Sequence, residues 1–158
     1  MFAAGRAARP VIAALLAAVL FVSASSVRAG EATQREFETL MNTVASGWNE
    51  GDARKAADCY AEDAIYIEPP DKQLYRGREA LYEFFRGVKP APPTRMVWHH
   101  LSFNAESQVG FGEYTFHGNS RYHGIVVVKL RDGKISRWRE YQYKSDRPWE
   151  DFVGESRF

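Results

Sequence analysis

The sequence changes from a helical to an extended pattern within one segment, Tyr60-Ala61-Glu62-Asp63-Ala64-Ile65-Tyr66-Ile67-Glu68-Pro69-Pro70. From position 64 to position 68 the pattern has a period of two, which is typical of a strand. One face of this strand carries Ile65 and Ile67, and the other carries Tyr66 and Glu68. Because proline disfavours helix in the residue before it and cannot donate to a sheet ladder, we expect the strand to end at Glu68.

Glu68 therefore closes a strand, on the same face as the aromatic ring of Tyr66. Apolar surroundings disfavour the charged form of a carboxyl group and make it a useful general base near neutral pH. The alternative is a solvated strand end without catalytic meaning. From this segment alone the two interpretations stay open.

The first 29 residues have the three-part pattern of a secretory signal. Arg6 and Arg9 precede an apolar run over 11–22, and small residues follow up to Ala29, after which we expect cleavage. The run is shorter than the roughly 20 residues that cross a bilayer, so we expect no stable membrane anchor. We therefore expect a secreted or periplasmic protein with one domain over 30–158.

Removing the leader changes the sign of the net charge. Three of the 21 basic residues lie in the leader, so 18 basic residues face 20 acidic ones and the formal charge becomes −2. A near-neutral surface gives no reason to expect nucleic acid as a partner. The single cysteine, Cys59, cannot form an internal disulfide, and we expect it to be a buried thiol.

Helical spacing of apolar residues covers 31–49, 53–61 and 77–85, and Thr33 with Glu36 fits a capping box at the first start. Strand patterns follow, separated by turn residues; they cover 96–103, 110–116, 122–130 and 135–144. This order predicts an α+β fold with an antiparallel sheet.

The strand at 122–130 is apolar on nearly every position, which predicts that both of its faces are covered. Helices can cover one face, and a symmetric homodimer through the sheet would cover the other. The tail at 147–158 alternates aromatic and charged residues. We expect it to lie across the domain or a neighbouring subunit.

Four segments resemble the SnoaL-like group of the nuclear-transport-factor-2-like superfamily: Trp48-Asn49-Glu50-Gly51-Asp52, Tyr60-Ala61-Glu62-Asp63-Ala64, Gly77-Arg78-Glu79-Ala80 and Trp138-Arg139-Glu140-Tyr141. The resemblance implies a cone in which a curved sheet wraps around three N-terminal helices and encloses an apolar pocket. The superfamily includes ketosteroid isomerases, cyclases, dehydratases, epoxide hydrolases and non-catalytic modules, so fold does not decide function.

The resemblance also implies roles for single residues. Glu68 matches the Asp that moves the proton in the isomerases. Val44 stands at the position where the isomerases carry a Tyr that donates a hydrogen bond. His123, found by counting back from the Asp132-Gly133 turn, stands at the position where the isomerases carry a protonated acid. Glu140 matches the catalytic Asp of the epoxide-hydrolase branch.

Alternation along the last strand places Trp138 and Glu140 on one face. We therefore expect Glu68, His123 and Glu140 to meet in one pocket as candidate catalytic residues. The expected substrate-binding residues are Val44, Trp48, Tyr66, Phe84, His100 and Trp138. The alternatives are that Glu140 pairs with an Arg, that His123 binds a backbone group, and that the Trp residues belong to the core.

We expect no metal and no cofactor. His99 and His100 are adjacent in a strand pattern and should point to opposite faces, so both cannot bind one ion. Two functions remain. One is an exported, cofactor-independent acid–base enzyme (isomerase, cyclase, dehydratase or hydrolase) acting on a small hydrophobic molecule; the other is a non-catalytic periplasmic ligand-binding or dimeric assembly module.

Overall fold

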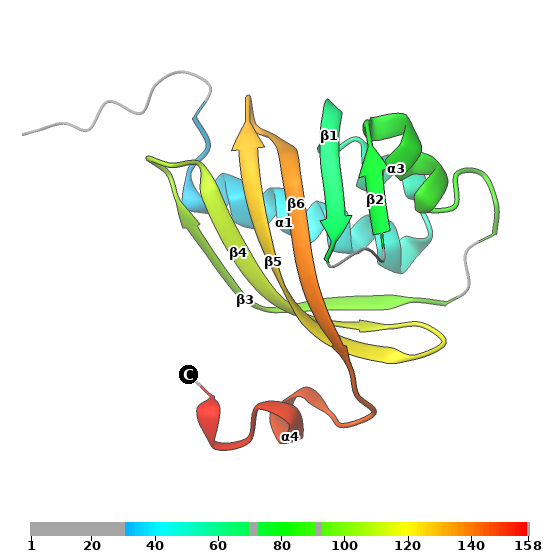
Figure 1. The fold of residues 1–158 in the computed structure, drawn as a ribbon, viewed down its shortest axis with the longest axis vertical. Helices are drawn as coiled ribbons and strands as arrows, with labels where there is room; N and C mark the ends of the chain where they lie inside the picture. The colour runs from blue at the N-terminus through cyan, green and yellow to red at the C-terminus, as the bar shows by residue number, and fades with distance from the viewer. Residues whose placement is uncertain (1–30, 70–72, 91–92, 158) are drawn as a thin grey trace, which may run out of the picture.

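The computed structural model describes residues 31–69, 73–90 and 93–157 (Figure 1). Their helices are α1 (Gln34–Glu50), α2 (Ala53–Ala57), α3 (Arg78–Phe84), α4 (Trp149–Val153) and the 3-10 turn η1 (Gly154–Ser156). Their strands are β1 (Tyr60–Glu68), β2 (Gln73–Arg76), β3 (Arg95–Asn104), β4 (Val109–His117), β5 (Arg121–Arg131) and β6 (Lys134–Lys144). The predicted leader, 1–29, lies outside the described residues.

The strands form one curved sheet of six, in the order β2-β1-β6-β5-β4-β3. The predicted α+β class is confirmed, with one difference. The sheet was expected to be antiparallel, but β1 pairs with β6 in parallel, so the sheet is mixed. A local pattern cannot indicate this pairing, because it joins segments about 70 residues apart in the chain.

The local signals around α1 are confirmed. Thr33 and Glu36 form the capping box, and Gly51 ends the helix in the left-handed conformation with a φ of 71°. The second helix is shorter than predicted, because it ends at Ala57 and β1 already begins at Tyr60. The start of β1 pairs with β6 before a bulge that ends at Ile65, so sheet pairing overrides the helical pattern there.

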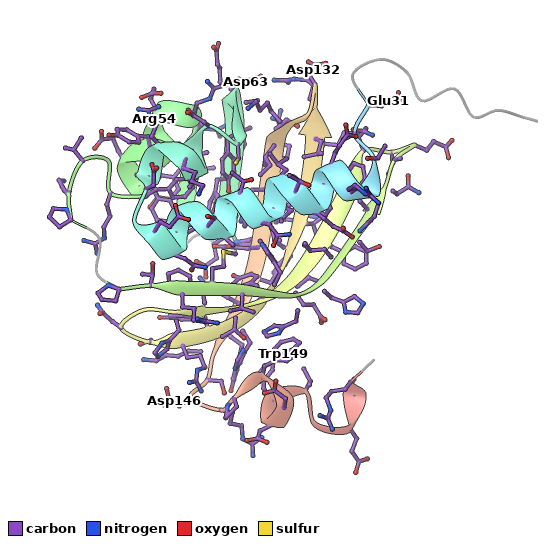
Figure 2. All side chains as sticks on the ribbon, turned by 180° about the vertical axis from the view of Figure 1, so that it is seen from behind. Glu31, Arg54, Asp63, Asp132, Asp146 and Trp149 are labelled. Atoms are coloured by element: carbon purple, nitrogen blue, oxygen red, sulfur yellow. The ribbon has the colours of Figure 1, made fainter. Side chains whose placement is uncertain are left out.

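We call the sheet face on which α1 packs the inner face, and the opposite one the outer face. Helix α1 crosses the inner face (Figure 2). The core lies between α1 and the inner face. Its largest fully buried side chains are Tyr60, Phe37, Met41, Leu81, Ile135, Val44, Val126 and Val128. His123 is also fully buried, but it does not belong to this core. Burying one large apolar side chain contributes roughly 1.5–3 kcal/mol, so these residues position the sheet on the helix.

A bulge in β6 keeps the inner side chains of β6 in step with those of β5. Leu130 pairs with Ile135, but Lys129 pairs with Arg137, so Ser136 forms a bulge between them. The Ser136 hydroxyl donates to the Lys129 carbonyl at 3.0 Å. The alternation of β5 runs unbroken through buried Leu130, Val128 and Val126, and the bulge takes up the extra residue of β6 so that Trp138 and Glu140 share that inner face.

The outer face is only partly covered. Helix α4 lies over the end of the sheet where β6 leads into the tail, with Trp149 between helix and sheet (Figure 2). This confirms that the tail packs on its own domain. Exposed large side chains remain on the outer face at Phe111, Ile125, Tyr141 and Tyr143. Along the described residues, no helix has both the length and the apolar character needed to cross a bilayer.

Candidate functional site

A cavity of about 270 Å³ lies on the inner face. Its described lining residues come from α1, α3 and all six strands, and they are Trp48, Tyr66, Gln73, Phe84, Met96, Tyr114, Phe116, Tyr122, Trp138, Glu140 and Gln142. Seven of these eleven residues are aromatic. An apolar pocket with a few polar groups is the usual form of a small-molecule site.

Glu140 is the one acidic residue among these lining residues. Its side chain is only 5% exposed and accepts three hydrogen bonds. The Tyr66 hydroxyl donates to Oε1 at 2.5 Å, and the indole Nε1 of Trp138 and the Tyr114 hydroxyl donate to Oε2 at 3.0 and 3.3 Å. The proposed pairing of Glu140 with an Arg is therefore wrong, because neutral donors hold this carboxyl group.

Burial raises the pKa of Glu140 above its ordinary value, and the nearby charge of Glu68 raises it further. The hydrogen bonds from Tyr66, Trp138 and Tyr114 act in the opposite direction, but burial is the largest effect. A carboxyl group whose pKa lies above the ordinary range exchanges protons closer to neutral pH. This is the property that a general acid–base catalyst needs.

Glu68 lies beside this site. It is 2% exposed at the end of β1, and its Oε2 accepts a hydrogen bond of 3.0 Å from Nε2 of Gln73. Tyr66 is aligned with Trp138 in the parallel pair, so Glu68 follows on the face that carries Glu140. The predicted alternation of β1 is thus confirmed, and Glu68 is not a solvated strand end.

Five of the predicted site residues line the pocket: Trp48, Tyr66, Phe84, Trp138 and Glu140. The prediction for Val44 was wrong. Val44 is fully buried in the core and is not among the lining residues. The residue of α1 that lines the pocket is Trp48, one helical turn further along.

The prediction that His123 shares the pocket was also wrong. The alternation of β5 continues from buried Leu130, Val128 and Val126 to Gly124 and Tyr122, so His123 lies on the outer face. There Nε2 of His123 donates to the Arg147 carbonyl at 2.9 Å. The alternative interpretation, in which His123 binds a backbone group, is therefore confirmed. Its ring also packs on Phe152 of α4, with the centroids 4.4 Å apart.

His100 lies outside the pocket as well. A second bulge, between Trp98 and His100, disturbs the alternation of β3. His99 and His100 therefore both line an outer cavity beneath α4, although adjacent strand residues were expected on opposite faces. Among the described residues, no group of three or more His, Cys, Asp or Glu side chains is placed to hold a metal ion.

Several lining residues were not predicted from the sequence: Gln73, Met96, Tyr114, Phe116 and Tyr122. Alternation along β4 could have identified two of them, since Tyr114 and Phe116 follow two inward glycines at steps of two. The pairing of β4 with β5 also sets Tyr114 opposite Gly124. This glycine leaves room for the phenol ring that reaches Glu140.

Replacing Gly124 by Ala is expected to disturb that arrangement. A Cβ atom would lie 2.8 Å from Cζ and Oη of Tyr114 and 2.7 Å from the Tyr141 carbonyl. We expect a loss of about 1–3 kcal/mol in the free energy of unfolding, measured by urea denaturation. Gly118→Ala is the control, because its nearest atom would be 3.5 Å away. Equal stability of both variants would contradict this account.

The docking of α4 is expected to weaken in acid. His99 stacks on Trp149 with the ring centroids 4.1 Å apart. Burial lowers the pKa of His99 below its ordinary value of 6.5. The charge of Glu150 raises this pKa and that of His123 lowers it, but burial is the largest effect. A lowered histidine pKa means that stability is complete above the unfolded pKa of about 6.5 and decreases as the pH falls towards the folded value. Amide exchange in α4, corrected for intrinsic rates, should accelerate between about pH 7 and pH 5. In His99→Gln this dependence should diminish, and an unchanged dependence would contradict the assignment.

The fold and the pocket define a class of protein, the nuclear-transport-factor-2-like α+β cone. The sequence profile of the SnoaL-like domain matches residues 42–138. The chain belongs to the SnoaL-like family, as its sequence motifs indicated. A search of curated proteins found no match.

Solved structures support the same fold. An NTF-2 like protein of unknown function from Burkholderia xenovorans LB400 is 20% identical, with 75% of this chain and 93% of that chain covered and a TM-score of 0.59. An LEH-like epoxide hydrolase from M. tuberculosis is 15% identical, with 69% and 84% covered and a TM-score of 0.60. The epoxide hydrolase/cyclase-like enzyme SalBIII is 22% identical, with 70% and 95% covered and a TM-score of 0.58. At these identities the likeness establishes the fold alone.

Proposed function

We propose that this protein is an acid–base enzyme that moves a proton on a small hydrophobic molecule, with Glu140 as the principal acid–base group. The observation that carries the proposal is the buried carboxyl group of Glu140 in an aromatic pocket, where burial raises its pKa. Isomerisation, cyclisation and epoxide opening share this requirement for a positioned carboxyl group. The similar structures of an epoxide hydrolase and an epoxide hydrolase/cyclase-like enzyme support this reaction type.

The surroundings of Glu140 support a precise role. Three donors fix the orientation of the carboxyl group, and the stacked ring pair of Tyr66 and Trp138, 5.6 Å apart, shields it from water. A fixed and desolvated base transfers a proton without the reorganisation that it would need in water. Glu68 contributes a second carboxyl group whose charge affects that of Glu140.

A chemical probe tests this proposal without knowledge of the natural substrate. Base-catalysed ring opening of 5-nitrobenzisoxazole removes one carbon-bound proton, breaks the N–O bond and releases a coloured phenolate. We expect the protein to accelerate this reaction above the buffer rate, with a rate that rises with pH through the raised pKa of Glu140. A rate equal to that of buffer, despite binding of the probe, would oppose the proposal.

One observation favours a non-catalytic ligand carrier instead. The carboxyl group of Glu140 already has three partners within the protein, which also suits a purely structural acid. In that case ligand binding would be indifferent to Glu68→Gln, and the probe reaction would not respond to either carboxyl group. Native mass spectrometry of the purified protein would show what occupies the pocket.

We also propose that two copies associate through the outer face. Strand pairing sets Ile125 beside Tyr141, and both are exposed. Basic side chains, Arg137 and Arg139, lie towards the start of β6, whereas the acidic α4 segment follows its end. A twofold axis across the sheet would bring the basic end of one copy to the acidic end of the other.

The dimer proposal predicts that a charge in the apolar patch separates the copies. Tyr141→Glu should give a monomer mass by light scattering at concentrations where the wild type is a dimer, because an unpaired buried carboxylate is costly. Glu62→Gln, an exposed change at the bulge of β1, is the control. A monomeric wild type would refute the dimer.

Export is the remaining proposal, and it rests on the leader pattern of residues 1–29. Expression with a C-terminal tag should yield a mature protein that starts at Gly30. A full-length chain that retains Met1 would contradict export.

A further inference from the structure

The pocket wall is rich in aromatic faces and hydrogen-bond acceptors and contains little positive charge. Seven of its eleven described lining residues are aromatic, and none of the eleven is Lys, Arg or His. The face of an aromatic ring is electronegative and attracts cations, most strongly for Trp. Trp48 and Trp138 both belong to the lining.

The donors that surround Glu140 are already engaged. The hydroxyl groups of Tyr66 and Tyr114 and the indole of Trp138 all donate to Glu140. An ionised carboxylate can accept about four hydrogen bonds, so roughly one position remains for a ligand. A ligand oxyanion would find these donors occupied and the carboxylate close by.

A second acceptor belongs to Gln73. Its Nε2 donates to Glu68, whereas its Oε1 is buried and has no hydrogen-bond partner among the described residues. A buried acceptor without a partner loses hydration and gains nothing in return. A donor on the ligand would remove this deficit.

We propose that the ligand of this pocket is a protonated amine attached to an apolar body. Its N–H groups donate to the Glu140 carboxylate and to Oε1 of Gln73, and its carbon atoms lie against the aromatic wall. The inference rests on the proposed function and specifies its substrate class. An ammonium group held there places the bonds next to its nitrogen beside the carboxyl group that moves the proton.

The test uses two probes of nearly equal size, benzylamine, which is a cation at neutral pH, and benzyl alcohol, which is neutral. We expect calorimetric titration of the full mature chain to show benzylamine binding at least about tenfold more tightly, because a charge-assisted hydrogen bond and a cation–π contact are both added. Glu140→Gln should remove this preference, because the amide carries no charge. Glu113→Gln, on the outer face, should keep the preference.

The pH dependence gives an independent readout. Benzylamine affinity should rise with pH as the Glu140 carboxyl group ionises, and benzyl alcohol affinity should not. Equal binding of both probes, or binding of neither, overturns the amine assignment. The benzisoxazole reaction tests the proposed acid–base function separately. A preference for neutral ligands would therefore refute the amine assignment and leave the acid–base function standing.

Discussion

Replacing Glu140 by Gln is expected to lower the rate of benzisoxazole ring opening by about 10²–10⁴-fold, because general acid–base catalysis contributes an effect of that size. Gln has nearly the same shape and can still accept hydrogen bonds through its carbonyl oxygen, but it cannot take up a proton at neutral pH. The packing of the pocket should therefore persist while the chemistry is lost. Initial rates at saturating probe, followed by absorbance of the phenolate, measure the change.

Two further variants separate catalysis from a general loss of structure. Glu113→Gln removes a carboxyl group of the outer face and should leave the rate unchanged. Tyr66→Phe removes the 2.5 Å hydrogen bond that lowers the pKa of Glu140, so the pH–rate profile should shift to higher pH. A Glu140→Gln protein that retains the wild-type rate would assign the chemistry to another group.

Trp138→Ala is expected to reduce the free energy of unfolding by about 3–5 kcal/mol, the range for truncation of a buried large aromatic residue. Trp138 is 2% exposed, stacks on Tyr66 and lies 5.9 Å from the ring of Tyr60. Its removal leaves a void between β1 and β6 and takes away one donor to Glu140. Urea denaturation followed by circular dichroism measures the loss.

The matched variant Trp138→Phe distinguishes packing from hydrogen bonding. It keeps an aromatic ring but lacks the indole N–H, so the carboxyl group of Glu140 loses one hydrogen bond, at a cost of about 1–3 kcal/mol. Tyr143→Ala, at a residue 67% exposed on the outer face, should change stability by less than about 0.5 kcal/mol. A Trp138→Ala loss as small as that of Tyr143→Ala would show that the inner face tolerates the void.

The local part of the fold could be predicted from the sequence. The capping box of Thr33 and Glu36, the period of two in β1 and the alternation that sets Trp138 and Glu140 on one face are all short-range signals, and all three are confirmed. The alternation of β1 and β6 suffices to place the two acids together with Tyr66 and Trp138. The reason is that helix caps and strand alternation depend on neighbours within a few residues.

The errors have a different physical origin. The face of His100 depends on a single-residue bulge, whose position is set by pairing across the sheet. His123 was placed by counting back from a turn in a resembling family, whereas the alternation of β5 from buried Leu130 turns it outward. The parallel contact of β1 with β6 is likewise a long-range choice. Val44 was assigned through a resemblance, and the place of a residue in a family does not ensure that it reaches the cavity.

The extra residue at Ser136 has an evolutionary consequence. A hairpin that lacked Ser136 would still pair Leu130 with Ile135 and Lys129 with Arg137, so the inner faces of β5 and β6 would stay the same. One codon gained or lost at this position therefore changes the length of the hairpin and leaves Glu140 in the pocket wall.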